Sequence, residues 1–279
     1  MSATNPLVSI IMPAYNAAPF IGASIESVLK QSHGHWELLV INDGSKDATE
    51  QVVLSFNDAR IRYFHQQNRG VSSARNLGLQ QMRGDFLCFL DADDLLPSTS
   101  LERRLAFMHQ HPGVQMLDSQ VDVYNADFSK RLRTYAPAYS GLWWKGLITL
   151  NSACFFGPNV FLRNNFQILP MKEGLTHGED YLFYLNNAVR YQLVYHFLPE
   201  VCYLYRQSNS SAMSNLAGLE KGYNRILGEV KKMPEVGFLD WKRLELRIMR
   251  ILLLSFVAAR QYGKGLSQLG RLFRSAAAS

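Results

Sequence analysis

The first hundred residues alternate short apolar runs with segments whose apolar positions recur every three to four residues. The apolar runs predict four strands, at Val8–Met12, Glu37–Ile41, Ile61–His65 and Asp85–Leu90. The segments between them predict helices at Phe20–Lys30, Asp47–Phe56 and Val71–Met82. Strands that alternate with helices in this way are typical of βαβ units and a mostly parallel sheet.

The pattern is less regular after residue 97. Its apolar positions predict helices at Ser98–His111 and Asp180–Arg190, and strands at Val114–Tyr124, Gln192–Phe197 and Cys202–Tyr205. An aromatic, turn-rich stretch runs through Trp143-Trp144 to Pro170 without a clear element. The chain then has a helical pattern to its end, without an internal repeat or a low-complexity linker.

The cysteines and the N-terminus bear on the compartment. The chain has 279 residues and three cysteines, Cys88, Cys154 and Cys202, which form no CxxC pair and lie in apolar or aromatic surroundings. Such residues are typical of buried free thiols in a reducing compartment. No basic segment followed by a long apolar stretch opens the chain, so we expect a cytoplasmic protein without a secretory signal.

The net charge of +6 is concentrated in the last part of the chain. Residues 1–237 contain 21 basic and 21 acidic side chains, whereas residues 238–279 contain eight and two. Arg250 and Arg260 bracket nine mainly apolar residues, and a membrane crossing needs about 20. The tail is therefore either a surface that attracts anionic lipid or an ordinary packed helical subdomain. We expect no nucleic-acid binding, because the tail carries no recognised motif.

Two carboxylates, in Asp91-Ala92-Asp93, follow the apolar run Phe86–Leu90 directly. Parallel strands with right-handed crossovers bring their carboxyl ends to one edge of a sheet, where ligands bind. Hard cations such as Mg²⁺ and Mn²⁺ favour carboxylate oxygens together with substrate phosphates. The pair therefore indicates a metal site at that edge, although acidic residues also occur in loops that open helices.

Three further residues have two interpretations each. Asp43 follows the second strand, where it can accept a hydrogen bond from a nucleotide base or take part in an Asx-type turn. Arg75 lies at the start of a helix among small residues, where it can bind a diphosphate or face solvent. Asp180, three residues after His177, opens a helix, where it can act as a general base or complement the helix dipole.

These pieces occur together and in order, and in that combination the chain resembles the family 2 glycosyltransferases. The resemblance covers roughly residues 7–206. It rests on the segments Ser9–Asn16, Ile41–Ser45, Gly70–Gly78, Asp91–Asp94 and Gly178–Asp180.

The resemblance implies an α/β protein of the GT-A fold, with a Rossmann-like, mostly parallel central sheet and a C-terminal helical extension. Residues 1–97 would bind the nucleotide sugar, residues 98–214 would bind the acceptor and hold the catalytic base, and residues 215–279 would form the basic helical extension. The implied reaction is sugar transfer with inversion from a nucleotide diphosphate sugar, expected to be a UDP-sugar.

The resemblance also implies roles for single residues. The implied donor-binding residues are Pro13, Ala14, Tyr15, Asp43, Arg75, Asp91 and Arg206. Within this set the first three would border the nucleoside, Asp43 would accept from the base, and Asp91 would hold the ribose. Asp93 would contact Mn²⁺ or Mg²⁺ bridging the diphosphate, where the ion offsets charge on the leaving nucleotide. Asp180 would be the catalytic base.

One departure narrows the expected reaction. Processive members carry a Gln-x-x-Arg-Trp motif after the Glu-Asp pair, and neither that motif nor a membrane-spanning stretch occurs here. We therefore expect addition of a single sugar to a saccharide or lipid-linked saccharide, in bacterial surface polysaccharide assembly at the inner face of the cytoplasmic membrane. Trp143 and Trp144 either stack on acceptor sugars or pack in the core.

Two other functions remain open at this point. Phosphatases of the haloacid-dehalogenase type also place Asp-x-Asp at a strand end and use Mg²⁺. They follow the second aspartate with Gly-Thr or similar near the N-terminus, whereas Asp94-Leu95 follow here, after three βα units. A polysaccharide-assembly protein without turnover is the second alternative, and an intact Asp93 and Asp180 disfavour it.

Overall fold

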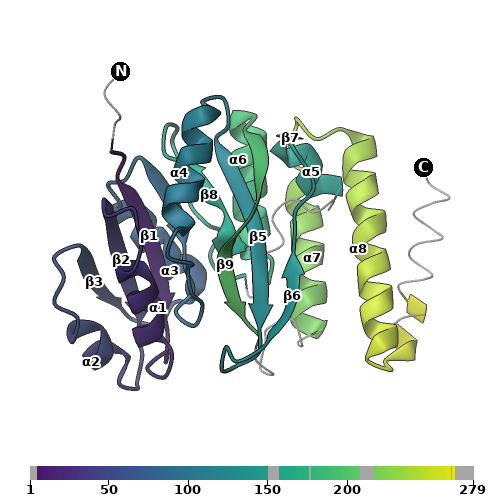
Figure 1. Ribbon diagram of the computed structural model, residues 1–279. Helices are drawn as coiled ribbons and strands as arrows, with labels where there is room; N and C mark the ends of the chain where they lie inside the picture. Colours follow the sequence, from purple (N-terminus) through teal and green to yellow (C-terminus); the bar gives the residue numbers. More distant parts are fainter. Residues whose placement is uncertain (1–4, 150–156, 176, 208–215, 265, 268–279) are drawn as a thin grey trace.

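The computed structural model describes residues 5–149, 157–175, 177–207, 216–264 and 266–267. One sheet of nine strands runs through the molecule in the order β3-β2-β1-β4-β8-β5-β9-β7, and β6 pairs with β5 (Figure 1). The strands are β1 (Val8–Ala14), β2 (Trp36–Asp43), β3 (Ile61–Gln66), β4 (Phe86–Phe89), β5 (Met116–Tyr124), β6 (Arg131–Tyr135), β7 (Gly141–Leu142), β8 (Phe161–Arg163) and β9 (Val194–Arg206).

The described residues also form helices and a short 3₁₀ turn, and the last two helices follow the final strand. These elements are α1 (Ile21–Leu29), α2 (Thr49–Leu54), α3 (Val71–Gln81), α4 (Ser100–Gln110), α5 (Trp143–Thr149), η1 (Gly157–Asn159), α6 (Glu179–Tyr191), α7 (Leu216–Val230) and α8 (Phe238–Ala258). β1 to β4 are parallel, as predicted, and β8 runs antiparallel between β4 and β5. β5 and β9 are parallel to one another, so the carboxyl ends of β1, β4, β5 and β9 point the same way (Figure 1).

The side chains of the central strands separate into two apolar cores, one on each face of the sheet. In β2, Leu38 and Val40 belong to the core beneath α1 and α4, whereas Leu39 and Ile41 belong to the core covered by α3, α5 and α6. A strand that is buried on both faces is apolar at successive positions. This is why the parallel strands were visible in the sequence as short continuous apolar runs.

The predicted strands at Gln192–Phe197 and Cys202–Tyr205 are one strand, β9. Its pairing with β5 jumps from Ser119 opposite Leu198 to Gln120 opposite Val201, so Pro199 and Glu200 bulge out of the ladder. Proline has no N–H to donate, and a bulge is one of the few places where a sheet tolerates it. The polar interruption that suggested two strands is therefore a bulge within one.

Trp143 and Trp144 pack in the core rather than offering a platform for sugars. They begin α5 and are 0% and 7% exposed. Trp143 stacks on Tyr195 at a ring-centroid distance of 5.4 Å, and the Trp144 indole donates a hydrogen bond of 3.1 Å to Gln192. The packing interpretation of this pair is confirmed.

The described part of the C-terminal extension, α7 and α8, packs on the rest of the protein with one side. Buried residues of α7 and α8 join the same core as α5 and α6; they include Leu219, Ile226, Leu244, Ile248, Leu252 and Phe256. No helix in the described ranges is long and apolar enough to cross a membrane. Cys88 and Cys202 are buried free thiols, as predicted, and Cys154 lies outside the described residues.

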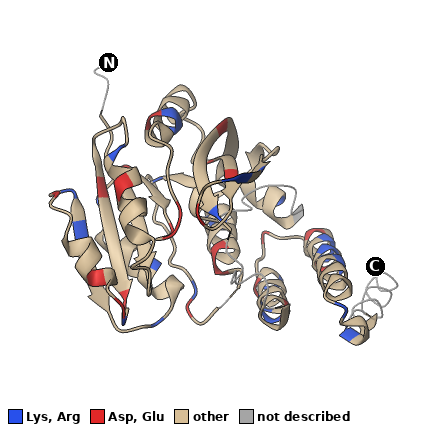
Figure 2. Ribbon diagram, turned by 60° about the horizontal axis from the view of Figure 1, so that its bottom comes forward, with Lys and Arg blue, Asp and Glu red and all other residues tan. Residues whose placement is uncertain are grey.

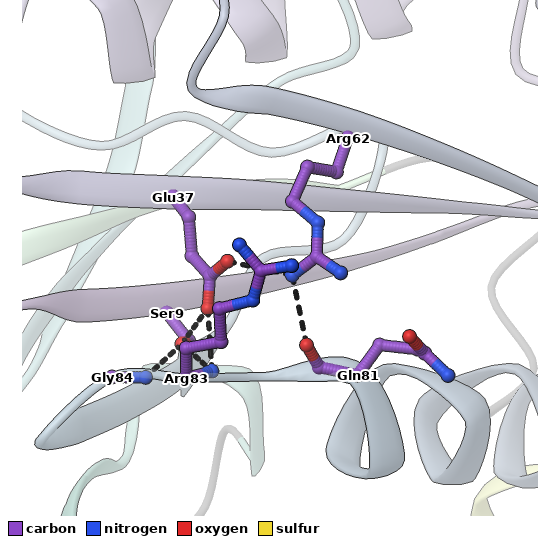
Figure 3. Close-up of polar contacts among 6 residues, drawn as sticks. All are labelled: Ser9, Glu37, Arg62, Gln81, Arg83 and Gly84. Atoms are coloured by element: carbon purple, nitrogen blue, oxygen red, sulfur yellow. Dashed lines mark hydrogen bonds and ion pairs between the residues drawn. The ribbon is translucent and has the colours of Figure 1, made fainter.

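A buried polar cluster fixes the amino ends of the first strands, opposite the edge where the predicted site residues lie (Figure 3). Glu37 of β2 accepts hydrogen bonds from the Ser9 hydroxyl (2.7 Å), the Arg62 guanidinium (2.7 Å) and the Arg83 backbone N–H (2.6 Å). Burial alone would raise the pKa of Glu37, but these hydrogen bonds outweigh burial and lower the pKa. The carboxylate thus joins β1, β2, β3 and the loop before β4.

We predict that Glu37→Gln lowers the free energy of unfolding by about 1–3 kcal/mol near pH 7, because Arg62 and the Arg83 N–H lose a charged acceptor. Since the folded-state pKa is lowered, this stabilisation is present above the ordinary glutamate pKa of about 4.3 and is lost as the pH falls through the folded-state value. Urea unfolding of both proteins at neutral and acid pH measures the difference.

Glu26→Gln is the matched control for this prediction. Glu26 pairs with Lys30 at 3.0 Å on an exposed helix surface, where a pair of this kind contributes about 0.3–0.5 kcal/mol. A neutral-pH effect of Glu37→Gln no larger than that of Glu26→Gln would contradict the structural role of the cluster.

Candidate active site

A cleft of about 390 Å³ opens at the carboxyl edge of the parallel strands. It is lined by the end of β1 and the loop after it, the end of β2, the first turns of α3, the loop after β4 and the first residue of α6. Seven of the predicted site residues line it: Pro13, Ala14, Tyr15, Asp43, Arg75, Asp91 and Asp93. The fold therefore collects from distant parts of the chain the residues that the motifs identified.

Close packing of α3 on the sheet brings Arg75 to this edge. A Cβ atom on Gly78 would lie 2.4 Å from the Ile11 side chain of β1, so only glycine permits the observed approach. Arg75 is 4% exposed, and its guanidinium donates a hydrogen bond of 2.8 Å to Asp91. It also lies 4.0 Å from the Glu179 carboxylate of α6. The solvent-facing interpretation of Arg75 is wrong.

The charges around Arg75 explain why a buried guanidinium is tolerated. Burial disfavours its charged form, but the neighbouring carboxylates of Asp91, Asp180 and Glu179 outweigh burial and raise the pKa of Arg75. Conversely, burial and the charge of Asp180 raise the pKa of Glu179, which Arg75 offsets only in part. Arg75 is thus a shared counter-ion for acidic groups that come from two elements.

Asp91 and Asp93 form an acidic pair on the cleft wall. Burial and the charge of Asp91 raise the pKa of Asp93, and Arg206 opposes this shift. In the described part of the chain no group of three or more His, Cys, Asp or Glu residues is arranged to hold a metal. Two carboxylates completed by phosphate oxygens and water are, however, an ordinary Mg²⁺ or Mn²⁺ environment. The residues therefore fit an ion that binds together with a diphosphate.

Asp94, the third acidic residue of the motif, is an internal anchor for the loop after β4. It is 1% exposed and accepts hydrogen bonds of 2.7 Å from both the Tyr203 hydroxyl and the Arg206 N–H. Burial and the charges of Asp91 and Asp93 raise the pKa of Asp94. The sequence shows a third aspartate after the apolar run, but it does not show whether that side chain is exposed in a loop or buried as an anchor.

Arg206, at the end of β9, does not line the cleft but holds one of its walls. Its Nε donates a hydrogen bond of 2.7 Å to the Asp93 carbonyl, and its Nη1 donates to the Ala126 carbonyl. Its guanidinium lies 4.7 Å from the ring centroid of Phe20 and 4.5 Å from that of Phe128. With 9% exposure it is not a surface residue, and its contacts fix the backbone that presents Asp93.

Asp43 lines the cleft while it holds the loop before α3. Its carboxylate accepts hydrogen bonds from the Gln66 side chain (2.7 Å) and from the backbone N–H groups of Arg69 (2.9 Å) and Gly70 (2.8 Å). The Asx-type turn weighed for this segment exists, but Asn42 makes it by accepting from the Ser45 N–H at 2.9 Å. Asn42 thus forms the turn, and its neighbour Asp43 lines the cleft.

Asp180 lies beside the cleft, in the first turn of α6. Its Oδ1 accepts a hydrogen bond of 2.7 Å from the Tyr181 N–H. Glu179 is the residue of α6 that lines the cleft, a position that sequence reasoning missed because it favoured the second carboxylate of the pair. Burial, together with the charge of Asp180, raises the pKa of the Tyr223 hydroxyl in α7.

Comparison with known proteins places this geometry in a family. Residues 9–169 match the family described as Glycosyl transferase family 2. The Escherichia coli protein named UDP-Glc:alpha-D-GlcNAc-diphosphoundecaprenol beta-1,3-glucosyltransferase WfgD is 33% identical over 232 residues, which are 82% of this chain and 88% of that protein. The chain belongs to the family 2 glycosyltransferases and is a glycosyltransferase enzyme, as predicted.

Solved structures show the same fold. S. aureus TarS 1-349 in complex with UDP-GlcNAc aligns with a TM-score of 0.69 and 20% identity, over 96% of this chain and 81% of that chain. Mannosyltransferase PcManGT from Pyrobaculum calidifontis, in complex with GDP-Man and Mn²⁺, aligns with a TM-score of 0.65 and 16% identity, over 98% and 85%. The predicted GT-A fold is confirmed.

Several other curated relatives are longer than their matched part. The chain spans only 17% to 44% of their length. The family assignment therefore rests on the family match and on WfgD, and the complete activities of these longer proteins are not carried over to this chain.

Proposed function

We propose that this enzyme transfers one sugar, with inversion, from a nucleotide diphosphate sugar to a hydroxyl of a saccharide or lipid-linked saccharide. The observation that carries the proposal is the cleft in which Asp91 and Asp93 adjoin the buried Arg75 at the carboxyl edge of the sheet. The name of WfgD, which describes UDP-glucose and a lipid-diphosphate acceptor, supports a UDP-sugar donor and a lipid-linked acceptor, and we propose a role in surface polysaccharide assembly.

The cleft offers a distinct wall to each part of the donor. Tyr15 is 49% exposed, so its ring is free to pack against the nucleoside beside Pro13 and Ala14. Asp43 has further lone pairs with which to accept from a base N–H. We assign Asp91 to the ribose and Arg75 to the base or the diphosphate. Arg206 acts indirectly, because it binds the Asp93 carbonyl and so positions Asp93.

Asp93, with Asp91 beside it, would hold Mn²⁺ or Mg²⁺ against the diphosphate. The ion would offset the charge that develops on the departing nucleotide. The rest of the chemistry is a single displacement: the acceptor oxygen forms a bond to the anomeric carbon as the bond to the diphosphate breaks. The electron pair of that bond leaves with the nucleotide, and Asp180 takes the acceptor proton. One displacement inverts the anomeric centre.

The alternatives are less well supported. A phosphatase of the haloacid-dehalogenase type is not favoured, because the family match covers the segment that contains the acidic pair. A protein without turnover is disfavoured because the acidic pair and Asp180 are both present, and each is held by backbone or side-chain contacts.

We predict that Asp180→Asn retains nucleotide-sugar binding but loses at least 100-fold in kcat, because general-base catalysis contributes roughly 10²- to 10⁴-fold. Single-turnover transfer and calorimetric donor binding measure the two effects separately. Glu220→Gln, on the neighbouring helix α7, is the matched carboxylate control and is expected to keep its kcat. Turnover close to that of the unaltered enzyme in Asp180→Asn would exclude this residue as the base.

We further propose that the enzyme binds peripherally to an anionic membrane through the outer face of α8. On that face Arg243, Arg247 and Arg250 lie successively along the helix, followed by the exposed Leu254 and Val257. In Figure 2 the ribbon of this helix carries several blue, basic positions. Helix α8 ends at the side of the molecule to which β5 points (Figure 1). A surface with basic and apolar residues favours the interface of an anionic bilayer.

Vesicle co-sedimentation tests the membrane proposal. We predict that Arg243→Glu/Arg250→Glu lowers partitioning onto phosphatidylglycerol-containing vesicles by at least tenfold, since each basic residue near such a surface contributes about 1 kcal/mol. Lys30→Glu/Arg103→Glu changes the net charge equally, at one exposed position directly after α1 and one on α4, and is expected to have little effect. Equal loss in both variants, or none in either, would refute a specific α8 surface. Charge reversal is preferable to deletion because the other face of α8 is part of the core.

A further inference from the structure

A buried polar network lies outside the donor cleft and has no part in the reaction described so far. Arg104 of α4 is 0% exposed and donates hydrogen bonds to the Asn159 side chain (2.7 Å) and the Cys202 carbonyl (3.1 Å). Asn159 in turn accepts from the Ser119 hydroxyl at 2.7 Å and donates to the Asp118 carboxylate of β5. The network joins Asn159, the last residue of η1, directly to α4 and β5 and, through Arg104, to β9.

The first residue of the same turn lies directly against the proposed base. A Cβ atom on Gly157 would be 2.3 Å from Asp180 Oδ2 and 2.9 Å from its Cγ, distances that atoms in contact do not adopt. The Gly157 carbonyl accepts a hydrogen bond of 2.5 Å from the Tyr184 hydroxyl, and Tyr184 lies one turn beyond Asp180 in α6. Helix α6 and the turn are therefore attached to each other beside the Asp180 carboxylate.

Helix α7 closes a second side of this region by equally close contacts. A Cβ atom on Gly222 would lie 2.5 Å from the His177 carbonyl oxygen, and one on Gly178 would lie 2.6 Å from Ile226 Cδ1. Gly178 also has a φ of +73°, which favours glycine. The residues that lead into α6 are thus packed closely against α7.

We infer that η1 is a positioning element for Asp180, in which the Arg104–Asn159–Asp118 network fixes the turn and Gly157 sets the place of the carboxylate. The inference rests on the proposed role of Asp180 as the base. One carboxylate oxygen accepts from the Tyr181 N–H, and the other faces Gly157, where any side chain would push it away. Gly157, Asn159 and Arg104 act through Asp180 and do not touch the reacting atoms.

The test compares Gly157→Ala with Gly228→Ala in the full-length enzyme. Gly228 is an exposed glycine of α7 whose added Cβ would meet nothing within 4 Å. We expect Gly157→Ala to lower kcat roughly 100-fold, because a misplacement of about 1 Å has an effect of that size, while the donor KM changes less than about twofold. Gly228→Ala is expected to keep both constants. An unchanged kcat in folded Gly157→Ala would overturn the inference.

A double-mutant comparison separates positioning from general damage. Asp180→Asn and Gly157→Ala act on one group, so we expect Gly157→Ala to cause no further loss of kcat in the Asp180→Asn background. An equal loss in both backgrounds would overturn the inference. Full turnover of the single variant Asp180→Asn would refute the base assignment. An inactive Asp180→Asn beside a fully active single variant Gly157→Ala would leave the base assignment intact and overturn only the positioning role of η1.

Tyr184→Phe keeps the inference testable if Gly157→Ala does not fold. This variant retains the ring but removes the hydroxyl that donates to the Gly157 carbonyl. We expect a several-fold lower kcat, an unchanged donor KM and, again, no additional loss in the Asp180→Asn background. Native kcat in Tyr184→Phe would contradict the proposed attachment of the turn to α6.

Discussion

The buried guanidinium of Arg75 is the constraint on which the donor cleft depends. Carboxylates from the loop after β4 and from the start of α6 lie close together at one edge of the sheet. Neighbouring like charges repel one another strongly in a partly buried site. Arg75 donates to Asp91 and lies within ion-pair distance of Glu179. Without this cation the partly buried acidic groups would be left uncompensated, which destabilises a protein more than replacing a whole ion pair by apolar residues.

Arg206 supports the opposite side of the same acidic loop by a different means. It binds the Asp93 carbonyl, while Asp94 accepts from the Arg206 backbone N–H and from Tyr203. Arg75 therefore binds the side-chain carboxylate of Asp91, whereas Arg206 binds the backbone at Asp93. Together they leave the Asp93 side chain facing the cleft, where a cation with a diphosphate can use it. The loop is preorganised from both sides before any substrate binds.

The parallel half of the fold was predictable because its periodicity is local. Each apolar run that ends in a polar loop became a parallel strand, with boundaries displaced by at most two residues. The later half was not, because β7 and β8 have only two and three residues and depend on partners far away in the sequence. Strands this short are determined by pairing and packing rather than by propensity. The bulge at Pro199 made one strand look like two in the sequence, because only the pairing of β9 with β5 shows that the strand continues past it.

The candidate site divides along similar lines. Motifs identified which residues gather at the edge, since parallel strands deliver their loops to one place. They did not show that Arg75 is buried, that Asp94 is an internal anchor, or that Gly157 adjoins Asp180, because each of these facts depends on contacts between elements far apart in sequence. Glycine in a turn suggests backbone freedom, whereas here the important property of Gly157 is the absence of a side chain.

Calorimetric titration of the full chain with UDP, with and without Mn²⁺, tests the central claim most directly. If Asp91 and Asp93 hold a cation together with a diphosphate, UDP binds at least about tenfold more tightly when the ion is present, a difference of about 1.4 kcal/mol. Asp93→Asn then removes most of that difference. Equal UDP affinity in the presence and absence of the ion, or an ion effect that Asp93→Asn leaves intact, would contradict the account.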